Sequence, residues 1–237
     1  MERSLCDVEY NYRTICENIA KAAQSVGKTA DDIIFLAATK TVDADTINHA
    51  ISLGLSYIGE NRVQELLSKY ESYDLEHASL QFIGHLQTNK VRQIVGKVDL
   101  IQSVDSVKLA KEISRCSQKQ GITTDILVEV NVGREENKSG VLPEALDDLL
   151  CQIAEIPNIM VRGLMTIPPI CGLPQENCKF FDYMHDIFID IGSKNRDNIS
   201  MDILSMGMSD DYIDAIKCGA NMVRVGSALF GARNYNV

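Results

Sequence analysis

The chain has 237 residues, of which 45% are hydrophobic, and its formal net charge at pH 7 is −10. That hydrophobic content is ordinary for a globular protein with a sizeable core, while the negative charge argues against nucleic acid or an anionic membrane as the main partner. The seven cysteines form no C-x-x-C pair and the N-terminus has no apolar signal core, so we expect a cytoplasmic protein without disulfides, a zinc site or a membrane segment.

The first expected element is an N-terminal helix within residues 1–28. Its apolar residues recur at alternating steps of three and four, which places them on one face of a helix, and Gly27 ends the pattern. These residues are Leu5, Val8, Tyr12, Ile15, Ile19, Ala22 and Val26. We expect this helix to pack outside the main fold, and a helix that binds a partner protein is the alternative.

Short apolar runs then alternate with helical segments over residues 33–237. The expected strands cover residues 33–39, 57–59, 80–84, 100–104, 126–130, 160–167, 203–206 and 222–225. Eight such strands alternating with helices predict an α/β fold of the (β/α)₈ TIM-barrel type, in a single domain that carries the N-terminal helix as an extra element. A doubly wound open sheet is the competing fold, but it would carry a glycine-rich turn after the first strand, where this chain has ATKTV.

The last two expected strands and the helix between them carry small and polar residues only where each strand ends. In a parallel α/β protein these ends are where ligands bind. Ser209 is positioned to cap its helix, whose first-turn N–H groups would face an anion. Gly226 allows a close backbone approach, Ser227 adds a hydroxyl and Arg224 is a permanent cation. These features predict a phosphate site, and a capped helix, a tight turn and a surface arginine are the plain alternative.

Polar residues also follow the other expected strands, and a barrel would bring all of them to one mouth. The full set is Lys40, Glu60, Asn61, His85, Asp105, Asn131, Thr166, Ser205, Ser209, Arg224, Gly226 and Ser227. Asp210 and Asp211 complement the dipole of the helix after the seventh strand but would repel a phosphate, so we expect both to point outward.

Lys40 has the strongest chemical implication, because it ends an otherwise apolar strand, IIFLAATK. A lysine buried there would have a lowered pKa and a free amine able to attack an aldehyde, whereas a lysine that extends to water would not. An amine that faces a phosphate pocket predicts an imine with pyridoxal phosphate or with a sugar phosphate. Asn61 could lie against a ring or cap its helix, and His85 could be a base or a structural residue. No histidine–carboxylate cluster has metal-ligand spacing, so no metal is expected.

Several segments along the chain resemble the pyridoxal phosphate homeostasis protein family, also called the proline synthase co-transcribed homologue family. They are LAATKTV, YIGENRVQE, QFIGHLQTNK, IQSVDS, VNVGREENKSG, GLMTIPP and LSMGMSDDYIDAIKCGANMVRVGSALFG. The resemblance covers all the expected strands and implies a barrel like the N-terminal domain of alanine racemase, with pyridoxal 5′-phosphate (PLP) held as an imine on Lys40. It also implies phosphate contacts from Ser209, Gly226 and Ser227, with Arg224 near the pyridine nitrogen.

Asn61 and Ser205 complete the expected cofactor-binding set, and no catalytic residue is expected. Two positions depart from the family pattern. Gln81 stands where a histidine is frequent and Asp43 where a proline is frequent, and neither is expected to touch the site.

Two arguments favour a cofactor-binding protein over an enzyme. An arginine beside the ring nitrogen cannot give a proton to it, so the pyridine stays unprotonated and is a weaker electron sink. The expected barrel also uses the whole chain, whereas the related racemases carry a further β-domain that supplies a second catalytic base.

The leading hypothesis is a protein of intracellular PLP homeostasis that holds the cofactor and passes it to PLP-dependent apo-enzymes, as a monomer or a weak dimer. The enzymatic alternative is a racemase-like or aldolase-like PLP enzyme that acts on amino acids or related substrates through the same imine. A third hypothesis is a regulatory interaction module that acts through its acidic surface and N-terminal helix.

Overall fold

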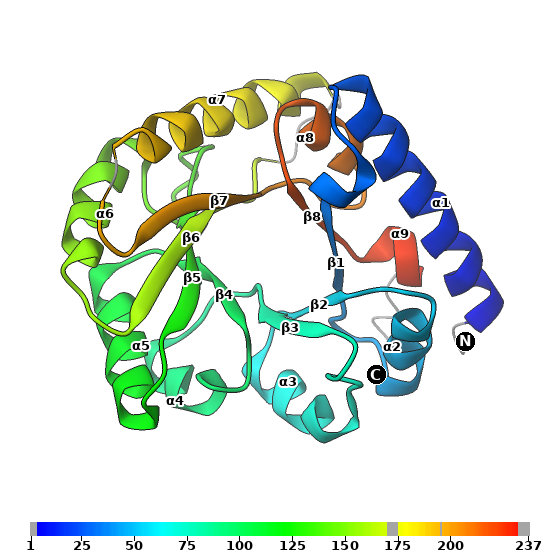
Figure 1. The fold of residues 1–237 in the computed structure, drawn as a ribbon, viewed down its shortest axis with the longest axis horizontal. Helices are drawn as coiled ribbons and strands as arrows, with labels where there is room; N and C mark the ends of the chain where they lie inside the picture. The colour runs from blue at the N-terminus through cyan, green and yellow to red at the C-terminus, as the bar shows by residue number, and fades with distance from the viewer. Residues whose placement is uncertain (1–3, 170–174, 195, 232–237) are drawn as a thin grey trace.

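The computed structural model describes residues 4–169, 175–194 and 196–231. Within these residues, eight parallel strands pair in sequence order and β8 pairs with β1, which closes a barrel (Figure 1). The strands are β1 Ile34–Ala38, β2 Tyr57–Glu60, β3 Ser79–Phe82, β4 Leu100–Val104, β5 Thr124–Val130, β6 Ile159–Thr166, β7 Ile199–Ser205 and β8 Met222–Val225. The TIM-barrel prediction is confirmed.

Helices surround the strands, and the extra helix α1 lies outside this ring beside α8, α9 and α2 (Figure 1). The helices are α1 Leu5–Ser25, α2 Ala44–Ser52, α3 Val63–Lys69, α4 Val91–Ile94, α5 Val107–Gln120, α6 Leu146–Ala154, α7 Gln175–Gly192, α8 Tyr212–Lys217 and α9 Ser227–Phe230. No helix in the described part of the chain is long and apolar enough to cross a membrane.

The barrel has two apolar regions. A small cluster fills its interior, and a much larger one lies between the strands and the helices. The interior cluster comprises Leu36, Ala38, Ile83, Leu100, Leu127, Met165 and Met222. Each strand is therefore covered on both faces, which is why the strands read as continuous apolar runs in the sequence. The register places Leu36 of β1 opposite Arg224 of β8, so the first and last strands bring their ends together.

Two predicted boundaries near the C-terminus are wrong. β7 begins at Ile199 rather than at residue 203, because its first residues are partly exposed and do not form an apolar run. The helix that follows has Asp211 at its N-cap position and begins at Tyr212 rather than at Ser209. The backbone turns first at residues 208–211, where the N–H groups of Asp211 and Tyr212 donate to the carbonyl of Met208.

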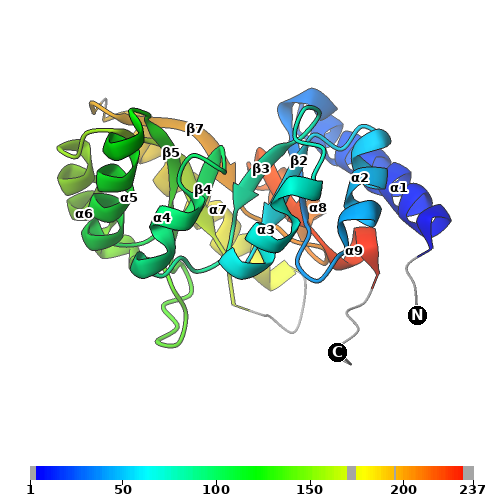
Figure 2. The same cartoon turned by 90° about the horizontal axis from the view of Figure 1, so that it is seen from below.

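The inner face of α1 packs against the barrel through Val8, Ile15 and Ile19, which are all buried. Leu5 and Val26, predicted for the same face, are 46% and 40% exposed because they lie at the two ends of the helix. Seen from below, the loop that follows β5 projects from one side of the molecule (Figure 2).

Candidate functional site

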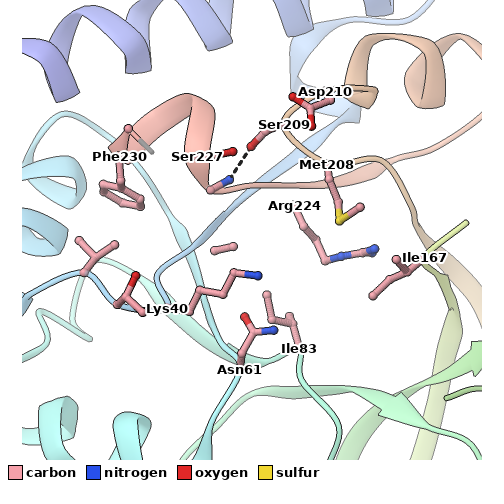
Figure 3. A pocket seen from close by; sticks show the side chains of 15 residues that line it. Lys40, Asn61, Ile83, Ile167, Met208, Ser209, Asp210, Arg224, Ser227 and Phe230 are labelled. Atoms are coloured by element: carbon pink, nitrogen blue, oxygen red, sulfur yellow. Dashed lines mark hydrogen bonds between the residues drawn. The ribbon is translucent and has the colours of Figure 1, made fainter. Parts of the chain in front are cut away.

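A cavity of about 230 Å³ opens at the C-terminal ends of the strands. All the predicted site residues except Ser205 line it, together with apolar side chains such as Ile83 and Phe230. They are Lys40, Asn61, Ser209, Arg224, Gly226 and Ser227. Figure 3 shows Lys40, Asn61 and Arg224 around one space, with the hydroxyls of Ser209 and Ser227 at another side of it. This volume is below the roughly 300–1,000 Å³ of pockets for drug-sized molecules, so the site suits a small ligand.

Arg224 is a buried cation on β8, only 4% exposed. Its Nη1 donates to the hydroxyl of Ser205 at 2.5 Å, and its Nη2 donates to the carbonyl oxygen of Thr166 at 2.8 Å. Both partners are neutral, and a guanidinium has five N–H donors, so these contacts leave donors for a ligand. Burial lowers the pKa of Arg224 to about 10, against the opposing effect of the Glu129 and Asp211 carboxylates, and the group is still cationic at neutral pH.

Glu129 on β5 is a buried carboxyl near this cation, with 7% exposure. Burial, with a smaller contribution from the neighbouring Asp105, raises the pKa of Glu129 to about 7, and Arg224 opposes both effects. A carboxyl with such a pKa changes its charge in the physiological range. Glu129 was not predicted as a site residue, although a carboxylate within the apolar run ILVEV is a signal that the sequence contains.

The segment that carries Lys40 is held from behind by a buried polar cluster. Lys69 donates to Glu60 at 2.8 Å and to the carbonyl of Thr39 at 3.3 Å. The hydroxyl of Thr39 donates to Glu60 at 2.9 Å. Thr41, directly after Lys40, has a φ of 63°, a left-handed conformation that few non-glycine residues adopt. Glu60, predicted at the mouth, therefore fixes the backbone of the Lys40 segment from behind and does not line the cavity.

The loop after β7 and the end of β8 are joined by Ser209. Its hydroxyl accepts a hydrogen bond from the N–H group of Gly226 at 3.1 Å (Figure 3) and another from that of Ala228 at 3.2 Å. The predicted helix cap by Ser209 is therefore wrong, because this hydroxyl is used between two strand ends. Among the described residues, the backbone N–H groups of Ser209, Asp210 and Ser227 donate to no acceptor, which leaves them available to an anion.

The two aspartates of this loop differ. Asp210 is exposed, as expected, although it borders the cavity. The expectation is wrong for Asp211, which is 8% exposed and accepts from the N–H of Met208 at 2.6 Å and from Asn177 at 2.9 Å. Burial raises the pKa of Asp211, and these hydrogen bonds oppose that effect. Asp211 thus stabilises the conformation of this loop through buried hydrogen bonds.

Asn61 forms another side of the cavity after β2. The Oδ1 atom of Asn61 is buried and has no hydrogen-bond partner among the described residues. An unpaired buried polar atom is costly, so this atom is a natural contact for a ligand. Gly84 makes the position possible, since a Cβ on Gly84 would lie 2.0 Å from the carbonyl oxygen of Asn61.

Other residues predicted at the mouth have structural partners. His85 is exposed and pairs with Ser139 at 3.2 Å. Asn131 holds the loop after β5, through the carbonyl of Glu135 at 2.8 Å. The hydroxyl of Thr166 donates to the carbonyl of Val130 at 2.7 Å. These side chains stabilise the backbone near the strand ends and are not among the residues that line the cavity.

Helix α1 lies behind the Ser209 loop and α9. Asn11 donates to the carbonyl of Leu229 at 3.0 Å, and Asn18 donates to the hydroxyl of Tyr212 at 3.1 Å. The N-terminal helix is therefore linked to the two short helices that flank the site. Only the apolar stripe of this helix was predicted, because its polar contacts depend on the far end of the chain.

The cavity thus combines an amine, a buried guanidinium, free backbone N–H groups and an unpaired amide oxygen. This set fits a small anionic ligand with further polar atoms on its ring. Throughout the described ranges, no group of three or more His, Cys, Asp or Glu side chains is arranged to hold a metal ion.

This barrel is similar in sequence to proteins of known families. The sequence pattern of the alanine racemase N-terminal domain matches residues 10–234, so the barrel is a domain of this class. The pyridoxal phosphate homeostasis protein of Aquifex aeolicus is 43% identical over 221 residues, which cover 93% of this chain and 96% of that protein. The chain belongs to the pyridoxal phosphate homeostasis protein family.

Two solved structures are similar over nearly the whole chain. A protein of unknown function from Bifidobacterium adolescentis has a TM-score of 0.91 and 34% identity, over 95% of each chain. The protein PipY of Synechococcus elongatus, solved with PLP bound, has a TM-score of 0.78 and 30% identity, over 90% of this chain and 100% of that one.

Proposed function

We propose that this protein binds PLP, holds it covalently through the amine of Lys40 and serves in PLP homeostasis rather than in a catalysed reaction. The observation that carries this proposal is that Lys40 and the buried cation Arg224 line one small cavity with the Ser209–Gly226 junction. PLP supplies an aldehyde that condenses with an amine, and an electron-withdrawing ring. Binding of PLP by PipY, which is similar to this chain over its whole length, supports the assignment.

The phosphate is assigned to the junction between the β7 loop and the end of β8. The hydroxyls of Ser209 and Ser227 and the N–H groups of Ser209, Asp210 and Ser227 can donate to phosphate oxygens there. Gly226 has no side chain to keep a ligand away from its backbone, and a Cβ at this position would lie 3.2 Å from the carbonyl oxygen of Ala38. The Asp210 side chain borders this position but is exposed to solvent.

The ring is assigned to the space between Asn61 and Arg224. Asn61 offers the unpaired Oδ1, and Arg224 offers N–H donors toward the ring nitrogen. Ser205 does not line the cavity but positions Arg224, because its hydroxyl accepts a hydrogen bond from the guanidinium at 2.5 Å. A guanidinium that stays charged cannot protonate the ring nitrogen, and an unprotonated pyridine withdraws electrons weakly. This disfavours carbanion chemistry and supports a carrier role.

Replacement of the amine tests the covalent link. Lys40→Ala should remove the yellow absorbance of the protein and the covalent attachment of PLP after borohydride reduction, measured by spectroscopy and mass spectrometry. Lys108→Ala on the exposed face of α5 is the control and should keep both. A reducible adduct that persists in Lys40→Ala would assign the link to another lysine.

The carrier role has its own test. Purified protein with single-enantiomer amino acids in deuterated water should exchange the Cα proton no faster than free PLP does. Faster exchange would favour the racemase-like alternative.

Transfer of PLP to PLP-dependent apo-enzymes completes the proposal. The holo-protein should restore activity to such an apo-enzyme, and reduction with borohydride should abolish this donation because the cofactor is then fixed. We propose that the protein works in the cytoplasm, as a monomer or a weak dimer, which sedimentation over a range of concentrations would establish. The free thiols of the described cysteines agree with a reducing compartment.

A further inference from the structure

A line of buried polar side chains crosses the barrel behind Arg224. The guanidinium donates to the hydroxyl of Ser205 at 2.5 Å, and that hydroxyl donates to Oε1 of Gln102 at 2.7 Å. Nε2 of Gln102 donates to Oε1 of Gln81 at 2.6 Å. The four residues come from β8, β7, β4 and β3, and none is more than 4% exposed. Gln81 does not line the cavity, but it is the last member of a series of hydrogen bonds that begins at Arg224, which does line the cavity.

The direction of every hydrogen bond in this chain is determined by its first member. A guanidinium has donors only, so Ser205 must accept from Arg224 and has its single proton left for Gln102. Gln102 then accepts through its oxygen, and its amide nitrogen must donate to Gln81. Gln81 is therefore required as an acceptor, and a residue without an acceptor at this position would leave a buried N–H group unpaired.

Arg224 has one other direct contact among the described residues, the carbonyl of Thr166 at 2.8 Å. Two contacts on the two terminal nitrogens fix the plane of the guanidinium. Loss of the Ser205 contact, or of the residues that orient Ser205, would leave the group free to rotate about the remaining one.

We propose that Gln81 is a positioning residue for the ligand: through Gln102 and Ser205 it sets the orientation of Arg224 and thereby the preference of the site for an unprotonated ring nitrogen. The inference rests on the proposed function, because it takes the ring of PLP as the group that Arg224 faces. A protonated ring nitrogen would place its N–H group against the N–H donors of Arg224, whereas an unprotonated ring nitrogen can accept a hydrogen bond from them. The discrimination is strongest when the guanidinium is held still.

The test compares PLP with 1-deaza-pyridoxal phosphate, in which a C–H group replaces the ring nitrogen. Both ligands keep the aldehyde and the phosphate, so the ratio of their dissociation constants isolates the nitrogen contact. The wild-type protein should bind PLP more tightly, and Gln81→Leu should reduce this ratio by about fivefold, the value of one neutral hydrogen bond. A merely structural role would weaken both ligands equally and leave the ratio unchanged.

Ser103→Ala is the matched control. Ser103 is the β4 neighbour of Gln102, it is 1% exposed, and its hydroxyl has no partner within the described part of the chain. This variant should keep the wild-type ratio.

Gln81→His provides a second variant of similar size, in case the leucine variant does not fold. A neutral imidazole accepts from Gln102, whereas a protonated imidazole has no acceptor and adds a charge. At pH 8 the preference of this variant for PLP over the deaza analogue should therefore be close to that of the wild-type protein. Between pH 8 and pH 6 this preference should decrease more in the variant than in the wild-type protein.

The possible results separate the inference from the proposed function. If the wild-type protein binds neither ligand, the proposed function fails. If it binds both and folded Gln81 variants keep its ratio at both pH values, the positioning role of Gln81 is overturned and the proposed function stands.

Discussion

The hydroxyl of Ser209 accepts a hydrogen bond from the backbone N–H of Gly226 at 3.1 Å, across a sequence separation of 17 residues. It thereby ties the loop after β7 to the end of β8 at the position assigned to the phosphate. The same hydroxyl accepts from Ala228, so one side chain orders both halves of this part of the site.

Ser209→Ala should weaken PLP binding about tenfold, because the alanine loses a hydroxyl that orders two N–H groups and contacts the phosphate. Pyridoxal, which has no phosphate, should lose much less affinity. Titrations of both ligands followed by absorbance would measure this difference, with Ser52→Ala on the exposed end of α2 as the control. An equal loss for the two ligands would show that the phosphate lies elsewhere.

Gly84→Ala should displace Asn61 and weaken PLP binding. The added Cβ would meet the carbonyl oxygen of Asn61 at 2.0 Å, so the backbone must move. Core overpacking of this kind destabilises proteins by about 1–3 kcal/mol. Thermal unfolding and PLP titration would measure both effects. Gly192→Ala at the end of α7 is the control, since its Cβ would make only an ordinary contact at 3.4 Å, and a stable Gly84→Ala protein with unchanged affinity would contradict the prediction.

Glu129 should make the ligand-free protein less stable as the pH rises. Its pKa is raised from 4.5 to about 7 in the folded state, so the folded protein binds the proton more tightly than the unfolded chain does. The resulting stability is present below pH 4.5 and is lost as the pH rises through about 7. Glu129→Gln should therefore raise the free energy of unfolding at pH 8, by up to about 3 kcal/mol, and much less at pH 5.

Denaturant unfolding at several pH values would measure this difference. Glu136→Gln, on the exposed part of the loop after β5, is the control and should follow the wild-type protein. A Glu129→Gln protein with the same pH dependence as the wild type would show that this carboxyl does not titrate in the range.

Lys69→Met should destabilise the protein by about 3–5 kcal/mol, because it leaves the fully buried carboxylate of Glu60 without its cation. The loss also frees the carbonyl of Thr39, next to Lys40, so PLP binding should weaken. The double variant Lys69→Met, Glu60→Gln should recover part of the stability, since no buried charge then remains unpaired. Denaturant unfolding of the wild-type protein and the two variants would test this prediction, and a double variant less stable than Lys69→Met would contradict this explanation.

Asn11→Ala should loosen α9, whose Leu229 carbonyl loses its donor on α1. Hydrogen exchange of residues 226–230 should become faster, and PLP affinity should fall about fivefold. Arg13→Ala is the control on the same helix, because Arg13 is exposed and pairs only with Glu9 among the described residues. Unchanged exchange in Asn11→Ala would show that α1 does not support this part of the site.

Local patterns in the sequence predicted much of the fold. Most strands are apolar runs that are buried on both faces, and the glycines Gly121 and Gly219 end their helices with positive φ values. The exceptions have local causes as well: the first half of β7 is partly exposed and therefore looked like a loop.

The sequence by itself determined the end of the barrel at which the site lies and several of the residues that line the cavity, because the C-terminal ends of parallel strands must meet at one end of a barrel. Lys40, Asn61, Arg224, Gly226 and Ser227 were identified in this way. What these side chains and their neighbours contact was decided only by the tertiary structure. Ser209 joins two strand ends instead of capping a helix, Asp211 is buried, and Gln81 reaches Arg224 through a hydrogen bond between residues 103 positions apart. Such contacts depend on closure of the barrel, which brings distant residues within hydrogen-bonding distance and leaves no trace in local spacing.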